Sequence, residues 1–381
     1  MHQFNFLAKL MTFEPQGSPF ISIFLNTAPN GTGKKDFDIF LNKQLKEHEF
    51  PFEEDSSELE SYREDVRRIN EFIEGLEPST RGAAIFASSG ADGFFKTFEF
   101  EVPFEENQFI VSDRPRIYPL VRLVAQHPPF AVVSADTNAA NIFIFKRGQT
   151  IQAEEIQNTK TNRSEVGGWS QMRYQRHIDN FHQQHAKEVV EELGKLVRAS
   201  RIERIVLVGD EAVIIPILRA ELTQELSEKV VGVLALNIDT PEHELLEASE
   251  KLIQEFDAVE DKERIDRLIE QNYDGGVGVS GVEHTIAALL NGQVQELYLT
   301  ANVDEINYSK NQVEGVVSAY EPVVEGALPD LSDREALLDQ LIKLAADSAD
   351  NIRFIEDPHL LKSLGGVGAL LRYQVKGVSN L

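Results

Sequence analysis

Residues 130 to 236 alternate short apolar strands with helices, and this alternation constrains the fold more than any other feature of the sequence. Three short strands are expected in "FAVVSAD", "NIFIFKRG" and "IQAEEIQ", with turn residues between them. A long helix then leads to the apolar strands "ERIVLVG" and "KVVGVLALN", which enclose the helical stretch "DEAVIIPILRAELTQEL". Continuous apolar strands separated by helices are typical of strands that are buried on both faces. This part of the chain therefore predicts a mixed sheet flanked by helices.

The regions on either side of this stretch also combine strands with helices. On the N-terminal side, the strands "SPFISIFLN" and "GAAIFASS" enclose an acidic helical stretch, and the pair Pro128–Pro129 marks a boundary. On the C-terminal side, a long helical run leads to the helices "GVEHTIAALLNG" and "SDREALLDQLIKLAADSAD" and the strands "QELYLT" and "NIRFIED". A chain of 381 residues is long enough for several domains. We therefore expect three α/β domains, at residues 1–126, 127–272 and 273–381.

Composition and charge exclude several classes of function. The chain has no cysteine, which excludes disulfides and zinc–thiolate sites and is typical of a protein of the reducing cytoplasm. Its formal net charge of −26 argues against nucleic-acid binding over the whole surface, because phosphates would be repelled. The first residues carry no signal-peptide pattern, and no segment reaches the roughly 20 apolar residues of a membrane span. We therefore expect a cytoplasmic protein without a membrane partner.

One stretch reverses the acidic character of the chain. "EVGGWSQMRYQRHIDNFHQQHAKEVVEEL", residues 165–193, contains the adjacent glycines Gly167 and Gly168 and the only tryptophan, Trp169. Basic and imidazole side chains follow: Arg173, Arg176, His177, His182, His185 and Lys187. Adjacent glycines permit backbone angles closed to other residues and let the backbone come close to a ligand. An ordinary loop before a solvated helix accounts for the same pattern, and a local patch for RNA phosphates is the functional alternative.

Helical spacing divides the residues after the glycines into two faces. A buried stripe is expected from Tyr174, Ile178, Phe181, Val189 and Leu193. Arg173, Arg176 and His177 project elsewhere, where they suit phosphate oxygens. Gln171 is neutral and no general base, but its carboxamide and backbone N–H can position a water and stabilise an oxyanion. The pattern predicts a loop tip that is delivered to RNA while the acidic remainder is kept away.

Other patterns are assigned to structure rather than to a bound group. "GVGVSG", residues 276–281, fits GxGxxG but follows a polar helical stretch instead of the strand that a dinucleotide site needs. We interpret it as a linker before a helix, with Ser280 as N-cap and Glu283 completing a capping box. His182 and His185 have no nearby carboxylate or cysteine to complete a metal site. We therefore expect no cofactor and no metal.

In their order along the chain, these motifs resemble the archaeal and eukaryotic class-one peptide-chain release factor family, which includes the Pelota rescue proteins, and more narrowly its bacterial relatives. The family carries a Gly-Gly-Gln loop followed by a basic helix with an "R(Y/F)xR" pattern, and here the chain has "GGWSQMRYQRH" and then the strand "RIVLVGD". The family's "GVEDTxxAL" helix corresponds to "GVEHTIAALLNGQVQELYLT", and its "GGIGGILRY"-like segment to "LGGVGALLRYQV". The resemblance runs from about residue 18 to the C-terminus.

The resemblance implies a fold and a set of sites. It implies a ribonuclease-H-like mixed sheet in the middle domain, and a C-terminal α/β/α sandwich that resembles ribosomal RNA-binding proteins and docks a translational GTPase. Gly167 and Gly168 match the loop glycines, and Gln171 is the counterpart of the glutamine that helps water attack the peptidyl-tRNA ester. RNA contacts are expected at Trp169, Arg173, Arg176, His177 and Lys187. GTPase contacts are expected at Gly365, Gly366, Gly368, Arg372 and Tyr373.

Two departures from the family keep the function open. Trp169 and Ser170 separate Gln171 from the glycines, so the indole either stacks on RNA or blocks close approach. Residues 1–125 lack the family's Asn-Ile-Lys-Ser loop and Tyr/Cys pair, which argues against codon-specific termination and leaves a degenerate codon-recognition-like domain. The first hypothesis is a factor for stalled or idle ribosomes, with hydrolysis of peptidyl-tRNA by the loop from Gly167 to Gln171. The alternatives are a non-catalytic ribosome-binding factor for hibernation or docking, and a tRNA-directed nuclease, although no cluster of acids near the loop supports metal-dependent cleavage. The expected partners are ribosomal RNA, peptidyl-tRNA and a translational GTPase.

Overall fold

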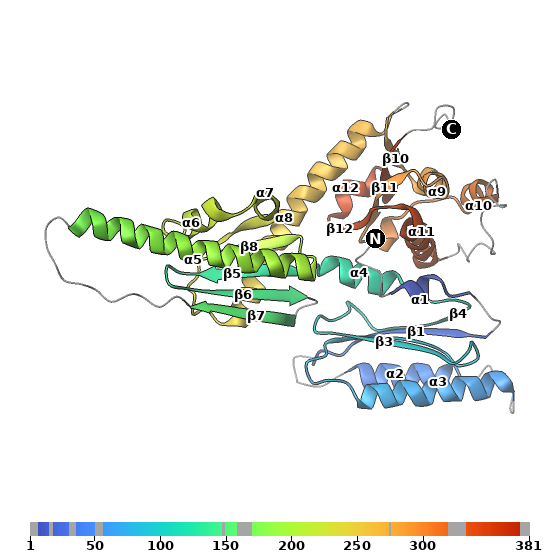
Figure 1. Cartoon of the computed structure of the whole chain (residues 1–381). Coiled ribbons are helices and arrows are strands. Elements are labelled where there is room, and N and C mark those ends of the chain that lie inside the picture. Colours follow the sequence, from blue (N-terminus) through green and yellow to red (C-terminus); the bar gives the residue numbers. More distant parts are fainter. Residues whose placement is uncertain are drawn as a thin grey trace. The chain divides into compact units, whose positions relative to one another are not determined.

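Three β-sheets organise the described chain, one in each of the three parts that the sequence divides into strands and helices (Figure 1). The computed structural model describes residues 7–14, 18–29, 36–49, 56–146, 149–157, 170–273, 276–318 and 333–373. By its internal contacts the chain forms two units. Unit 1 comprises Met1–Gln126 with Glu260–Leu381, and unit 2 comprises His127–Val259. The mixed α/β class with several sheets is confirmed, whereas the three domain ranges 1–126, 127–272 and 273–381 stay a prediction.

The N-terminal sheet of unit 1 is antiparallel, in the order β3-β2-β1-β4. Its strands are β1 (Phe20–Asn26), β2 (Gly82–Ser88), β3 (Phe94–Phe100) and β4 (Gln108–Ser112). Side chains alternate between the two faces of a strand. Ile21 and Ile23 therefore pack with α2 (Phe37–Glu47) and α3 (Ser57–Glu74), whereas Phe20 and Phe24 point into a second cluster on the opposite face. That second cluster also contains the short helix α1 (Ala8–Met11) through Leu10.

The C-terminal part of unit 1 is a sandwich of helices around the sheet β10-β13-β11-β12. The strands are β10 (Gly278–Ser280), β11 (Val294–Thr300), β12 (Asn351–Ile355) and β13 (Val367–Leu371). One face packs against α9 (Val282–Leu290), α10 (Lys310–Ser318) and α11 (Arg334–Ser348), for example through Leu297 and Leu341. The other face packs against α12 (Pro358–Lys362) and the end of α8 (Glu242–Gln271), through Leu361 and Leu268. The predicted α/β/α layering is confirmed, and we call residues 276–318 and 333–373 the C-terminal sandwich.

Unit 2 contains the five-stranded mixed sheet β7-β6-β5-β8-β9. Its strands are β5 (Phe130–Ala135), β6 (Ala139–Lys146), β7 (Gln149–Gln157), β8 (Arg204–Val208) and β9 (Val230–Leu234). β5, β6 and β7 pair antiparallel, whereas β5, β8 and β9 pair parallel. One face is covered by α5 (Ser170–Ser200) and α6 (Ile214–Glu221), and the other by the first half of α8; α7 (Gln224–Glu228) precedes β9. The predicted mixed sheet with helices is confirmed, and its ribonuclease-H-like kinship stays a prediction.

The glycine-rich stretch 276–281 differs from the sequence prediction. Gly278–Ser280 form β10, which pairs with β13, so this segment is a strand rather than a linker. The Ser280 Oγ accepts a hydrogen bond from Asn272 at 2.8 Å, and the residue before α9 is Gly281, with a φ of 81° and no side-chain cap. The carboxylate of Glu283 accepts the N–H of Ser309 at 3.0 Å. The predicted capping box is therefore wrong, because strand pairing places Ser280 before a left-handed turn that only glycine adopts easily.

Candidate functional site

Helix α5 contains the positions of the predicted RNA-contact residues Arg173, Arg176, His177 and Lys187. From Ala186 onward, its apolar side chains are buried in one cluster with β5, β6, β8 and α6. The buried members on α5 are Ala186, Val189, Val190, Leu193, Leu196 and Val197, which recur at helical spacing. Lys187 is exposed next to this buried stripe. The second part of the helix is therefore anchored on the sheet, and Lys187 is presented to solvent.

Of the residues predicted to reach RNA, Arg173, Arg176 and His177 lie in the first part of this helix. Gly167, Gly168 and Trp169 lie outside the described residues. α5 begins at Ser170, so Gln171 lies in its first turn rather than in a loop. Arg173, Arg176 and His177 belong to the next part of the helix, where the structure describes the backbone only. The first N–H groups of a helix have no partner within the helix, and they form the positive end of its dipole.

The two histidines farther along α5 differ in their environment. His185 is fully buried, whereas His182 is only partly buried and its ring lies 6.2 Å from that of Phe181, edge to face. A metal site would need both imidazoles to converge on one point. Within the described part of the chain, no three His, Cys, Asp or Glu side chains are grouped so that they could hold a metal ion.

The C-terminal glycines build a turn inside the C-terminal sandwich. Gly365 and Gly366 have φ angles of 74° and 81°, in the left-handed region that favours glycine. The carbonyl of Gly366 accepts the N–H of Thr300 at 2.9 Å, and that of Gly365 accepts the N–H of Asn307 at 3.1 Å. A Cβ on Gly366 would lie 3.0 Å from the carbonyl oxygen of Glu305. The turn therefore ties α12 to the end of β11.

The rest of the predicted GTPase-binding set has mixed environments. Gly368 lies in β13, where a Cβ would come within 2.6 Å of Leu268 Cδ2. Arg372 donates hydrogen bonds at 2.7 Å to the carbonyl of Ser348 and to the carboxylate of Asp350. Tyr373 is 50% exposed. Among these residues, Tyr373 is the side chain most open to a partner, and the glycines have roles in packing.

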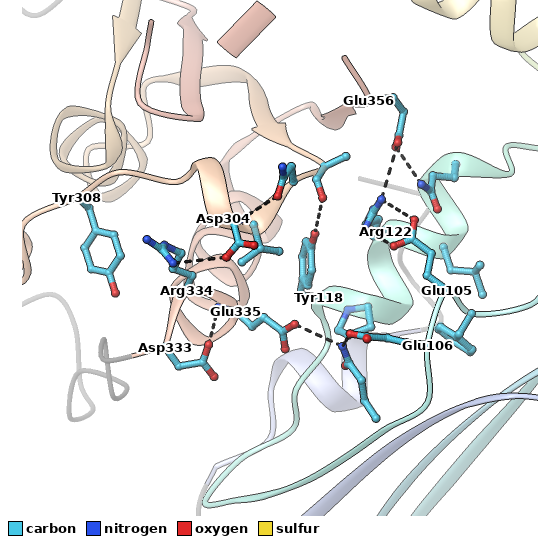
Figure 2. A pocket seen from close by; sticks show the side chains of 18 residues that line it. Glu105, Glu106, Tyr118, Arg122, Asp304, Tyr308, Asp333, Arg334, Glu335 and Glu356 are labelled. Atoms are coloured by element: carbon cyan, nitrogen blue, oxygen red, sulfur yellow. Dashed lines mark hydrogen bonds and ion pairs between the residues drawn. The ribbon is translucent and has the colours of Figure 1, made fainter. Parts of the chain in front are cut away.

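A cavity of about 1120 Å³ lies elsewhere in unit 1 (Figure 2). It is formed by the segment between β3 and β4, by α4 (Tyr118–Gln126), by the 3-10 helix η2 (Val303–Glu305) and by the start of α11. Its charged lining residues are Glu105, Glu106, Arg122, Asp304, Asp333, Arg334, Glu335 and Glu356.

Ion pairs within the cavity wall occupy its two arginines. Arg122 contacts Glu105 at 2.7 Å and Glu356 at 3.8 Å, and Arg334 lies 3.6 Å from Asp304 (Figure 2). Burial raises the pKa of the Glu335 carboxyl, and burial raises the pKa of Tyr118 to about 12. The remaining carboxylates give the lining an acidic excess, which favours cations over phosphates.

No local pattern in the sequence indicates this cavity or the buried carboxyl group beside it. Asp339 of α11 is 5% exposed, and Arg116 lies 3.6 Å from it. The only signal in the sequence is a charged residue on the apolar stripe of a helix, between Leu338 and Leu341. Charged residues are rarely buried without a partner, so the position of Asp339 indicates a polar contact but not the residue that makes it.

Comparisons with known proteins agree with the motifs of the sequence. Residues 115–254 match the bacterial archaeo-eukaryotic release factor family 10. The peptide chain release factor subunit 1 of Thermococcus kodakarensis is 22% identical over 288 residues, which span 68% of this chain and 69% of the relative. That of Thermococcus sibiricus is 22% identical over 293 residues, with the same shares. The predicted resemblance to release factors is thereby confirmed.

Two solved structures with low similarity to this chain are Dom34 and Pelota. Dom34 of S. cerevisiae, described as a translation termination-like factor involved in RNA quality control pathways and interacting with Hbs1, is 13% identical, with a TM-score of 0.43 over 78% of this chain and 82% of that one. Pelota of Archaeoglobus fulgidus is 16% identical, with a TM-score of 0.33 over 77% and 80%. Within the described residues, no helix is both long and apolar enough to cross a membrane.

Proposed function

Because the chain is a relative of the archaeo-eukaryotic class-one release factors, we propose that it is a ribosome-associated factor that acts on stalled or idle ribosomes. The observation that carries this proposal is the family match over residues 115–254, which includes the diglycine and the whole of α5. Ribosome binding, cytoplasmic location and a translational GTPase as partner are parts of the same proposal.

Binding to RNA is assigned to the beginning of α5. The formal net charge of −26 repels phosphates from most of the surface, whereas Arg173, Arg176 and Lys187 place positive charge along one helix. The buried stripe from Ala186 to Val197 holds the second part of this helix on the sheet of unit 2. A helix that is anchored at one end can carry its basic end into a site formed by ribosomal RNA or tRNA.

Hydrolysis of peptidyl-tRNA is assigned to Gly167, Gly168 and Gln171. A water oxygen attacks the ester carbonyl carbon, the bond to the tRNA oxygen breaks, and the 3′-hydroxyl of the tRNA takes up a proton. Gln171 orients the water, and backbone N–H groups at the start of α5 stabilise the negative charge on the carbonyl oxygen. The ribosome supplies the substrate and excludes bulk solvent.

Co-sedimentation with ribosomes tests the binding step. Arg173→Glu is expected to abolish co-sedimentation, because it replaces an attraction to phosphate with a repulsion. Lys262→Glu is the matched control, since Lys262 is an exposed lysine of α8 and its reversal changes the net charge by the same amount. Equal ribosome binding by wild type and both variants would refute the assignment to α5.

A non-catalytic ribosome-binding role is the second candidate. It is favoured by the start of α5 at Ser170, which places Gln171 within a helix instead of at the tip of a loop. Release of peptide from stalled ribosomes separates the two candidates. The catalytic proposal predicts release by the wild type and at least a tenfold slower rate for Gln171→Ala, roughly the loss of one oriented donor. Binding without release in the wild type establishes the non-catalytic role, and shortened tRNA in the same reaction establishes the nuclease.

The partner GTPase is assigned to the C-terminal sandwich near Gly365, Gly366, Gly368, Arg372 and Tyr373. Tyr373 is the test position, because its side chain is half exposed and large side chains of this type are common at the centre of interfaces. Tyr373→Ala is expected to weaken capture of translational GTPases without lowering the melting temperature. Unchanged capture would move the contact elsewhere.

A further inference from the structure

Helix α4 lacks an N-terminal cap of its own. The residue before it, Ile117, has an apolar side chain that accepts no hydrogen bond, and Pro119 has no N–H. The first N–H groups of a helix need an acceptor, and Ser, Thr, Asp or Asn normally provides it from the position before the helix. The first turn of α4 therefore depends on an acceptor from another part of the chain.

Asp339 of α11 provides this acceptor across the fold. Its Oδ1 accepts the N–H of Ile117 at 2.8 Å and the N–H of Tyr118 at 2.7 Å. Its Oδ2 lies 3.6 Å from Nη1 of Arg116, and neither of these two atoms makes a hydrogen bond within the described residues. Two N–H donors and the positive end of the helix dipole stabilise the position of this buried carboxyl group.

Apolar packing and one further hydrogen bond attach the same end of α4 to the C-terminal sandwich. The rings of Tyr118 and Phe354 lie 5.9 Å apart. The Tyr118 hydroxyl donates to the carbonyl of Ala301 at 3.2 Å (Figure 2). Leu120 and Leu341 are buried in the same cluster. α4 thus takes both its cap and much of its hydrophobic environment from residues that follow it by more than 180 positions.

The C-terminal sandwich also holds the segment by which the chain leaves unit 2. Arg353 of β12 lies 2.7 Å from Asp261 and 3.5 Å from Glu260, which are the first residues of α8 in unit 1. Asp261 is 7% exposed. α4 ends at Gln126, directly before unit 2 begins. The two chain segments that connect the units are therefore both attached to the C-terminal sandwich.

We propose that α4 is a conditional helix, whose first turn exists only while Asp339 caps it, so that the C-terminal sandwich controls the segment by which the chain enters unit 2. Loss of the cap opens α4 at its start and leaves the N-terminal sheet folded. This device is independent of the proposed function, because it requires only the intact chain and no ribosome.

The charges around Asp339 set its protonation. It faces Arg116 from the segment before α4 and Lys343 from its own helix, and Asp333 lies 3.0 Å from the same Arg116. Burial raises the pKa of Asp339 to about 7, against the opposite effect of the N–H donors and of Arg116. Burial also lowers the pKa of Lys343. The cap is therefore close to the balance between its two protonation states near neutral pH.

Hydrogen–deuterium exchange of the full chain tests the proposal. Asp339→Ala removes the acceptor, and exchange in residues 117–122 is expected to rise roughly tenfold, the usual worth of a lost cap. Exchange in β1 and β2 is expected to stay within about twofold of the wild type. Asp339→Asn keeps an acceptor oxygen and is expected to behave like the wild type at pH 7. Glu263→Ala, at an exposed acid of α8, is the matched control.

Three outcomes would overturn the proposal. Exchange in residues 117–122 that is unchanged in Asp339→Ala shows that α4 folds without its cap. Exchange that rises equally in α4 and in β11 and β12 shows a general defect of the core. Equal increases in Asp339→Asn and Asp339→Ala show that the hydrogen bonds to Ile117 and Tyr118 have no role. If Asp339→Ala does not fold, Asp339→Leu, which lacks the acceptor but leaves no cavity, replaces it, and unchanged exchange in residues 117–122 of that variant overturns the proposal.

Discussion

The long helices α5 and α8 have nearly the same length, 31 and 30 residues, but they differ in charge and in how they are attached. In α5, the buried apolar side chains run from Ala186 to Val197, and the basic residues Arg173 and Arg176 precede them. In α8, acidic residues occur along the whole length, and buried apolar contacts are found in both halves, at Leu245 and Leu268. Ion pairs with Arg204 and Arg353 add to these contacts.

The two helices therefore differ in role: α8 connects the two units of the chain, whereas α5 carries the basic residues Arg173 and Arg176. α8 uses its apolar and charged side chains to attach to both units of its own chain. The described contacts of α5 with the sheet of unit 2 run from Ala186 to Val197, and Arg173 and Arg176 precede them in the sequence. A basic cluster attracts an external polyanion that the rest of a chain of net charge −26 would repel.

Truncation of one buried leucine on each helix gives the largest expected effects. Leu193→Ala in α5 and Leu268→Ala in α8 are each expected to cost about 2–5 kcal/mol, because both side chains are almost fully buried. Hydrogen exchange resolved by segment is expected to show the loss in the sheet of unit 2 for Leu193→Ala and in the C-terminal sandwich for Leu268→Ala. Equal loosening of both sheets by either variant would contradict the separate anchoring of the two helices.

Two glycine substitutions test contacts of the same helices, and they are expected to change the free energy of unfolding in opposite directions. Gly368→Ala places a Cβ 2.6 Å from Leu268 of α8 and is expected to destabilise the chain by about 1–3 kcal/mol. Gly194→Ala in α5 meets only ordinary contacts, the closest at 3.5 Å, and is expected to stabilise by up to about 1 kcal/mol. Thermal unfolding of the two variants measures both changes. A stabilising Gly368→Ala would show that Leu268 has room to move.

A pH series tests the attachment of α4, the helix of unit 1 that directly precedes unit 2. The pKa of Asp339 is raised from 3.8 to about 7, so the folded chain binds more protons than the unfolded chain between these values. The contribution of Asp339 to the free energy of unfolding is therefore fully present below about pH 4. It is lost as the pH rises through about 7, by at most about 1.4 kcal/mol per pH unit.

Asp339→Asn lacks this titration. The free energy of unfolding of the variant minus that of the wild type is therefore expected to increase between pH 5 and pH 8. Denaturant titration of both proteins at each pH measures this difference. Parallel curves for the two proteins would show that Asp339 does not titrate in this range.

Single lysines give the smallest expected effects. Lys187→Ala removes one exposed cation of α5, and the dependence of ribosome affinity on salt is expected to fall by about one unit of slope, with a several-fold weaker affinity. Lys262→Ala on α8 is expected to leave the slope unchanged. A salt series in the ribosome-binding assay measures both. Equal salt slopes for both variants would contradict a special role of α5 in binding the ribosome.

The local pattern of the sequence was sufficient for most strands and for the long helices. Strands such as β1, β5 and β8 have continuous or alternating apolar residues, and α8 is helical over the range that the sequence indicates. These elements are set by neighbouring residues, so the sequence reports them directly.

The elements that the sequence did not predict depend on distant partners. α4 needs an acceptor at Asp339, far along the chain, and β10 exists through its pairing with β13. The predicted cap at Ser280 failed for the same reason, since sheet pairing took that residue into a strand. At the candidate site, Gly167, Gly168 and Trp169 are predicted from the sequence alone. The structure shows that α5 begins at Ser170, directly after them. The cavity of unit 1 is lined by five separate segments, which no local pattern brings together.

The affinity of the double variant Arg173→Glu/Arg176→Glu for ribosomes tests the central claim most directly. Lys251→Glu/Lys262→Glu, which reverses two exposed lysines of α8, is the control with the same net charge. The account predicts at least roughly a 100-fold loss of affinity for the α5 variant at moderate salt, against about threefold or less for the α8 variant. Equal affinities of the two variants would contradict it, because the basic start of α5 would then have no special role in binding the ribosome.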